Sequence, residues 1–176
     1  GLKTYHRLRV RSWMGLDHSG RPVQFERMGE FLCEASAKFL SNDEWVRYYA
    51  CDQDNVFKEM RMAANQVGKS INTFAYVGDF GGFSWTIAPR VLANEARLIT
   101  HLASVVERHY PEVAGNIIII NAGHVFKKLF EVFKLGLDPV TVGKIEVYSE
   151  VPLDRLLKLM PKSSIPTEYG GSCSRP

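Results

Sequence analysis

A run of four isoleucines, Ile117 to Ile120, is the strongest local pattern in the chain. Consecutive β-branched residues are typical of a strand that is buried on both of its faces. After Asn121 the period changes, and apolar residues recur at helical spacing from 125 to 137, with polar residues on the other side. The pattern from 116 to 148 therefore predicts a strand, a Phe-rich helix, a short helix started by Asp138 and Pro139, and a second strand at 144–148.

The same patterns predict the remaining elements. Strands are expected at 8–14, 23–28 and 71–77. A polar turn joins the first two into a hairpin, and 23–28 alternates as a half-buried strand does. Helices are expected at 30–40, 42–67, 89–110 and 153–160, and an extended closing segment at 165–171. Because strands and helices alternate through the second half, the predicted fold class is α/β with a largely parallel sheet.

Composition narrows the class of protein. A chain of 176 residues suits one domain with its own core, and 45% hydrophobic and 23% charged residues are ordinary for a soluble globule. The net charge of +3 does not argue for a nucleic-acid partner. No apolar run reaches about 18 residues, so no transmembrane helix is expected, and no signal peptide opens the chain. The absent initiator Met suggests an excised fragment.

The cysteines and histidines of the sequence give little support for a metal site or a disulfide framework. Cys33, Cys51 and Cys173 are widely spaced and form no CxxC pattern, which argues against a zinc site and a disulfide framework and favours reduced thiols in the cytosol. His101 and His109 lie about two turns apart on one predicted helix, too far for joint metal ligation. No metal ligand and no cofactor is expected.

Catalytic motifs are also missing. No GxxxxGK[ST] loop and no GxSxG elbow occurs, so neither a P-loop site nor a hydrolase nucleophile can be placed. Asp79-Phe80-Gly81 matches a kinase tripeptide, but the catalytic loop and the glycine loop of kinases are absent, which favours a plain Gly-rich turn. The sequence therefore predicts a protein that is not an enzyme.

Four segments carry motifs of a known family. They are DHSGRPV at 17–23, YPE at 110–112 with IINA at 119–122, FK at 133–134 with LDPVTVGKI at 137–145, and IPTEYGG at 165–171. In order and spacing they resemble the CRAL-TRIO lipid-binding domain, of the phosphatidylinositol/phosphatidylcholine transfer type. The resemblance covers about 15–171, which leaves 1–14 as a lead-in segment and 172–176 as a tail.

The resemblance implies a mixed, largely parallel five-stranded sheet that floors an apolar lipid pocket roofed by helices. One helix of that roof acts as a gate, and here it falls at 125–137. Packing in the core would explain its apolar face equally well without any function. The residues expected to line the pocket are Phe126, Phe130, Phe133 and Leu137.

The resemblance also implies headgroup contacts. Phosphatidylinositol binders of the family use a Glu and a Lys that fall here at Glu112 and Lys144. An ammonium group can pair with a phosphodiester, and a carboxylate can accept inositol hydroxyls. Thr141 adds a hydroxyl, and Ser84 and Thr86 are candidates for a phosphocholine headgroup. Phosphatidylinositol is thus the favoured cargo and phosphatidylcholine the second candidate.

The chain departs from the family on both sides of the gate. Gly123 and Gly136 stand where the family has proline-containing sequence, so the stiffness of the gate cannot be carried over. The small helical domain that precedes this fold is also absent. The expected function is a cytosolic, monomeric module that holds one phospholipid and touches membranes transiently. Two alternatives remain, namely a carrier of an isoprenoid or retinoid and a recruitment domain without cargo.

Overall fold

The computed structural model describes residues 11–29, 42–83, 112–134 and 137–174. These residues contain a sheet with the strand order β1-β2-β3-β4-β5. The first pair of strands is antiparallel and the other three pairs are parallel. The predicted α/β class with a mixed, largely parallel sheet is therefore confirmed. The strands are β1 (Arg11–Leu16), β2 (Pro22–Arg27), β3 (Phe74–Asp79), β4 (Ala114–Ile120) and β5 (Ile145–Val147).

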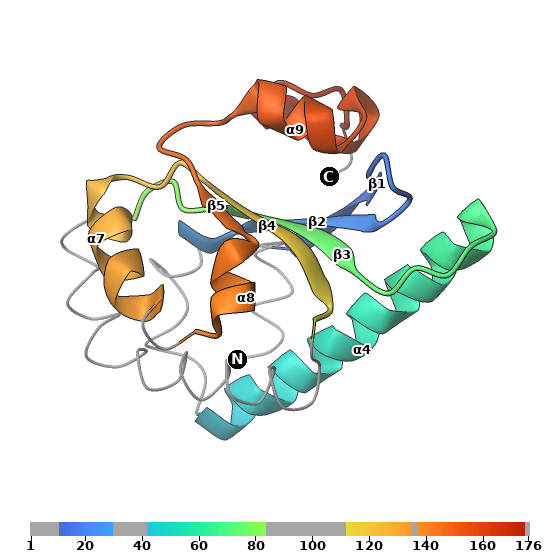
Figure 1. Cartoon of the computed structure of the whole chain (residues 1–176), viewed down its shortest axis with the longest axis horizontal. Helices are drawn as coiled ribbons and strands as arrows, with labels where there is room; N and C mark the ends of the chain where they lie inside the picture. Colours follow the sequence, from blue (N-terminus) through green and yellow to red (C-terminus); the bar gives the residue numbers. More distant parts are fainter. Residues whose placement is uncertain (1–10, 30–41, 84–111, 135–136, 175–176) are drawn as a thin grey trace.

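Helices lie on both sides of this sheet. Figure 1 shows α9 above it and α4, α7 and α8 below it. The bounds of α4 match the predicted helix 42–67, whereas the helices predicted at 30–40 and 89–110 lie outside the described residues. The helices are α4 (Asn42–Val67), α7 (His124–Phe133), α8 (Pro139–Gly143) and α9 (Leu153–Leu159), with short 3-10 helices η2 (Lys162–Ser164) and η3 (Thr167–Tyr169).

The predicted gate helix is shorter than expected. It ends at Phe133, and Leu137 lies beyond it in a bend, where its N–H donates to the carbonyl of Lys134 over 3.3 Å. The next helix, α8, begins at Pro139. The carboxylate of Asp138 accepts from the N–H of Val140 over 2.8 Å and caps α8, as the Asp-Pro pair predicts.

The closing segment is not extended, which corrects the prediction for 165–171. Residues Thr167–Tyr169 form a 3-10 turn, and Gly170 ends it with a φ of 85°. A left-handed residue after a helical turn satisfies a free carbonyl, here that of Thr167, and glycine adopts this conformation without steric cost. At Gly171 an added Cβ would collide with the backbone oxygen of Ile165. The two glycines fold the segment back on itself.

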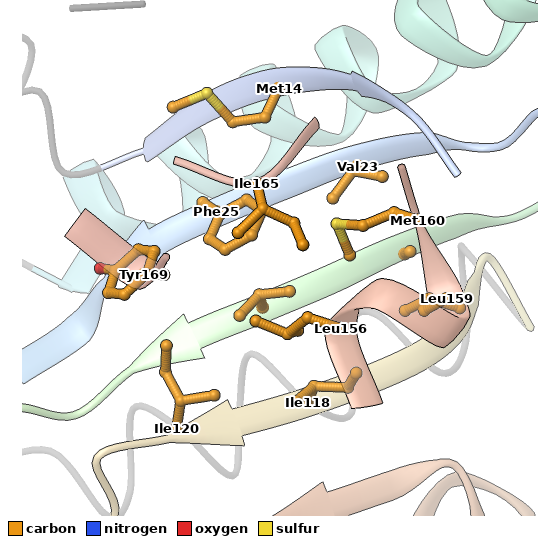
Figure 2. Close-up of a cluster of buried hydrophobic side chains, with 12 residues drawn as sticks. Met14, Val23, Phe25, Ile118, Ile120, Leu156, Leu159, Met160, Ile165 and Tyr169 are labelled. Carbon is orange, nitrogen blue, oxygen red and sulfur yellow. The ribbon is translucent and has the colours of Figure 1, made fainter. Parts of the chain in front are cut away.

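One face of the sheet is filled by α9 and the closing segment, and we call it the α9 face. Figure 2 shows the side chains of this core, which come from β1 to β4 and from the C-terminal helices. Leu156 of α9 and Ile165 are fully buried against the strands. The strand residues in the core are Met14, Val23, Phe25, Ala75, Val77, Ile118 and Ile120.

The opposite face carries the alternate residues of the same strands, and we call it the α7 face. Ile117 and Ile119 pack there with Phe126 of α7, while Ile118 and Ile120 point into the core of the α9 face. Side chains of successive strand residues alternate between the two faces, so the isoleucine run contributes side chains to the packing on both faces. Its predicted burial on two faces is confirmed.

The DHSGRPV motif folds as the turn between β1 and β2. One oxygen of Asp17 accepts from the N–H groups of Ser19 (2.8 Å) and Arg21 (2.9 Å), and the other accepts from Arg21 Nε (2.6 Å). Gly20 takes a φ of 82° in this turn. The Arg21 guanidinium also donates to Asn116 Oδ1 over 2.7 Å. The motif thus ties the hairpin to the start of β4, a structural role.

Candidate ligand-binding site on the α7 face of the sheet

A cluster of aromatic rings joins α7 to the sheet. The ring centroid of Phe126 lies 4.1 Å from that of Phe80, 6.1 Å from that of Phe130 and 6.3 Å from that of Phe83. Phe126 is buried and Phe130 is half-buried. Offset and tilted ring pairs at these separations are favourable. The predicted pocket residues Phe126 and Phe130 therefore do face the sheet, next to Ile119.

The other side of α7 is polar, as its period predicts. Lys127 Nζ donates to Ser149 Oγ over 2.7 Å at an exposed position, and Lys134 pairs with Glu131 one turn away. Exposed contacts of this kind contribute little to stability. The helix is accordingly held on the sheet by its apolar side rather than by its charges.

The two predicted headgroup residues lie at one edge of the sheet. Lys144 immediately precedes β5, and Glu112 lies two residues before β4. Because β4 and β5 are parallel and Ile117 pairs with Ile145, both residues are at the amino-terminal ends of neighbouring strands. At about 3.3 Å per residue, Glu112 is up to about 13 Å beyond the level of Lys144. Two long side chains with a headgroup between them can span this gap.

Thr141 lies one helical turn before Lys144 in the same segment. The N–H of Lys144 donates to the carbonyl of Thr141 over 3.0 Å, and both residues are half-buried. Residues three apart on a helix share a side. The structure therefore brings the hydroxyl of Thr141 and the ammonium of Lys144 to neighbouring positions at this edge.

Several predicted residues cannot be placed. Ser84, Thr86, Gly136 and the side chain of Phe133 lie outside the described residues. Leu137 is half-buried, after the end of α7. Gly123 is exposed and has open space around its Cβ position. The described surroundings of Gly123 therefore do not demand glycine at this end of α7.

Sequence reasoning missed a buried charged network on the α7 face. Arg11 Nη2 of β1 donates to Glu26 Oε1 of β2 over 2.7 Å, and Arg11 also forms an ion pair with Asp52 of α4. Tyr76 of β3 donates its hydroxyl proton to the other oxygen of Glu26 over 2.7 Å. Burial raises the pKa of Asp52 and the charge of Glu26 adds to the rise, whereas Arg11 opposes it.

The alternating pattern at 23–28 explains why this network was missed. Alternation predicts a half-buried strand with polar residues in water, which is wrong here, since Gln24 and Glu26 are both buried. The reason is that β2 is an interior strand, paired with β1 and β3 and covered on both faces. The register of the β1–β2 hairpin could have predicted this ion pair. It sets Arg11 opposite Glu26, and opposite charges on neighbouring strands attract.

Asp79 of the kinase-like tripeptide has a structural role. Its Oδ1 accepts from the N–H of Gly81 and from Asn121 Nδ2, each over 2.8 Å, and its Oδ2 accepts from the Tyr169 hydroxyl over 2.7 Å. The prediction of a plain turn fits these contacts. Across the described segments, no three His, Cys, Asp or Glu side chains cluster as a metal site would require. Likewise, none of the described helices is both long and apolar enough to cross a membrane.

Comparison with known proteins identifies relatives over most of the chain. A family model described as the CRAL/TRIO domain matches residues 7–171. The phosphatidylinositol/phosphatidylcholine transfer protein SFH9 of Arabidopsis thaliana is 32% identical over 160 residues, which are 90% of this chain and 27% of that protein. The SEC14 cytosolic factor of Yarrowia lipolytica is 30% identical over 159 residues, 90% of this chain and 32% of its own length. The chain thus spans about a third or less of these two relatives.

A solved structure shares the fold. The crystal structure of Sfh5 superimposes with a TM-score of 0.75 and covers 96% of this chain and 56% of its own. Only 17% of the aligned residues are identical, so this likeness concerns the fold.

Proposed function

Because the chain belongs to the CRAL/TRIO domain family, we propose that it is a lipid-binding and transfer module that holds one phospholipid between α7 and the sheet. Relatives at about 30% identity are named as phosphatidylinositol/phosphatidylcholine transfer proteins and as cytosolic factors, which supports this class of cargo and a cytosolic setting. The module needs no catalytic residue and no cofactor. It acts as a monomer and meets a membrane only while it exchanges cargo.

The favoured cargo is phosphatidylinositol. The observation that supports this choice is the parallel pairing of β4 and β5, which sets Glu112 and Lys144 at one edge of the sheet. The ammonium of Lys144 would bind the phosphodiester, with the Thr141 hydroxyl beside it, and the carboxylate of Glu112 would accept inositol hydroxyls. Phosphatidylcholine would bind through Ser84 and Thr86 instead.

We assign the gate to α7. Its inner side carries Phe126 and Phe130 of the ring cluster, and its outer side carries the exposed Lys127–Ser149 contact. Phe133 and Leu137 are the further pocket residues that the family resemblance implies. Moving α7 away from the sheet would expose apolar side chains, which acyl chains or a bilayer surface can cover. Gly123 lies at the start of this helix and permits a change of backbone direction there.

Lipid loading of the Lys144→Ala variant tests the cargo. The purified chain is incubated with vesicles that contain phosphatidylinositol and phosphatidylcholine, re-isolated, and its bound lipid is identified by native mass spectrometry. Phosphatidylinositol should be lost while phosphatidylcholine is retained, because the proposal places the headgroup of phosphatidylcholine at Ser84 and Thr86 rather than at Lys144. Lys158→Ala, an exposed lysine on α9, is the matched control. Equal loss of both lipids in a folded variant would contradict the assignment of Lys144 to the phosphatidylinositol headgroup.

Native mass spectrometry of the protein as purified from cells, before vesicles are added, separates the alternatives. Wild-type protein that returns an isoprenoid or retinoid in place of phospholipid would reassign the cargo within the same fold. Protein that stays empty under conditions that load a family member would favour a recruitment domain without cargo.

A further inference from the structure

The side-chain amide of Gln24 lacks a hydrogen-bond partner. The residue is only 2% exposed, and among the described residues no group accepts from its Nε2. Buried amides in native proteins are almost always paired, because an amide removed from water without a new partner costs free energy. An unpaired buried donor in this position therefore calls for an acceptor that the described part of the chain does not supply.

Strand register shows what Gln24 faces. It pairs with Trp13 of β1 and with Tyr76 of β3, and its neighbours along the strand, Val23 and Phe25, point into the core of the α9 face. Since successive side chains alternate between faces, the Gln24 amide lies on the α7 face. This is the face on which the proposed cargo lies.

The polar side chains next to Gln24 form hydrogen bonds and an ion pair with one another. The Tyr76 hydroxyl donates to one oxygen of Glu26, and Arg11 donates to the other. Arg11 also pairs with Asp52, so two carboxylates share one guanidinium. Among the described residues this network holds two carboxylates and one guanidinium, so a phosphate placed beside it would meet more negative than positive charge. This end of the sheet therefore suits an uncharged oxygen rather than a phosphodiester.

On the basis of the proposed function, we propose that Gln24 is a specificity-determining residue whose Nε2 donates to an uncharged oxygen of the cargo. The oxygen is a carbonyl or hydroxyl group, held at the β1–β3 end of the α7 face. Two sources share this chemistry, namely an acyl ester of a phospholipid and the terminal hydroxyl of a single-chain lipophile. Lys144 lies before β5, the strand at the opposite edge of the sheet from β1. One cargo molecule would therefore be anchored at two separated points.

The test compares the binding of paired probes by wild type and by Gln24→Met, which keeps the length and removes the amide. One pair is diacyl phosphatidylinositol and its diether analogue, which lacks the ester carbonyls. The other pair is an isoprenoid alcohol and the corresponding hydrocarbon. Wild type should prefer the oxygen-bearing member of one pair by about tenfold, the usual effect of one buried hydrogen bond. The exposed Gln66→Met on α4 is the matched control.

Each outcome has a defined meaning. If Gln24→Met abolishes discrimination within one pair, that pair identifies the oxygen, and the thermal midpoint of the cargo-free variant should be unchanged or higher. Unchanged discrimination in both pairs overturns the role of Gln24 while leaving lipid binding intact. A midpoint lowered by several degrees would show a structural partner and overturn it as well. Wild type that loads none of the four probes overturns this proposal together with the proposed function.

Discussion

The hydroxyl of Tyr169 donates a 2.7 Å hydrogen bond to Asp79 Oδ2 and so fastens the closing segment to the end of β3. The ring of Tyr169 also stacks on Phe25 of β2, with centroids 5.5 Å apart. Two strands of the sheet are thereby joined to a 3-10 turn at the far end of the chain. The EYGG motif, in which this tyrosine lies, closes the α9 face.

We predict that Tyr169→Phe lowers the free energy of unfolding by about 1–2 kcal/mol. The ring stack survives the change, but Asp79 loses a donor in a partly buried place. Urea unfolding measures the effect. Ser172→Ala, an exposed residue of the tail, is the control. A variant as stable as wild type would show that water replaces the hydroxyl without cost.

The burial of Tyr169 and its hydrogen bond to Asp79 also make the stability of the fold depend on pH at alkaline values. Burial raises the pKa of Tyr169 above its ordinary value of 10.0, and the bond to Asp79 raises it further. The neutral phenol is thus favoured more in the folded than in the unfolded chain, so its contribution to stability is complete below pH 10 and decreases above it. Wild type should lose stability above pH 10 faster than Tyr169→Phe. Parallel pH profiles of the two proteins would contradict this.

Neighbouring leucines of α9 should differ sharply. Leu156 is fully buried against the sheet, whereas Leu157 is 36% exposed. Truncation of a buried leucine removes apolar contacts and leaves a cavity, so Leu156→Ala should cost about 2–5 kcal/mol of unfolding free energy. Leu157→Ala should cost well under 1 kcal/mol, which is typical of surface changes (about ±0.5 kcal/mol). Similar losses in both variants would mean that α9 does not dock in solution as it does here.

Asp52→Asn should change how stability depends on pH. Burial raises the pKa of Asp52, with Arg11 opposing and Glu26 adding to the rise, so the ionised form is less favourable in the folded protein. Its contribution is present below the unfolded pKa and is lost as pH rises through the folded value. The variant should therefore gain stability relative to wild type as the pH rises above 3.8, the ordinary pKa of an aspartate. The exposed Asn55→Ala on the same helix, which removes no titratable group, is the control.

Glu112 combines a proposed binding role with a costly backbone conformation. Its φ is 58°, in the left-handed region, which costs a residue with a side chain about 1–2 kcal/mol. Glu112→Gly relieves this cost, whereas Glu112→Gln keeps it, and both remove the carboxylate. Both should weaken phosphatidylinositol loading, but the Gly variant should be the more stable in urea. If the Gln variant is the more stable, the positive φ does not persist in solution.

Elements with strong local signals could be predicted from the sequence. The helix α4 ends at Val67, immediately before Gly68, and α8 begins with the Asp138 cap and Pro139. The isoleucine run placed β4 correctly, because consecutive β-branched residues are typical of a strand that is buried on two faces. In each case the deciding information lies within a few residues of the element.

Features that depend on distant partners could not be predicted. The burial of Glu26 follows from strand order and from an arginine on another strand, and the pairing of Arg11 with Asp52 needs the docking of α4. The position of Glu112 and Lys144 at one edge depends on the pairing of β4 with β5. The family resemblance pointed to these two residues, and their role stays a prediction. No pattern in the sequence indicated that the amide of Gln24 would be buried without a hydrogen-bond partner among the described residues.

The alternation along β4 has a consequence for how such a protein changes over time. Ile118 and Ile120 maintain the fold with α9, while Ile117 and Ile119 face the other way. Under the proposed function, substitutions at the odd-numbered pair would alter what the domain carries while the even-numbered pair keeps it folded. Related proteins would then diverge in cargo by exchanging every second residue of the strand, and a mutant library restricted to those positions would explore the same path.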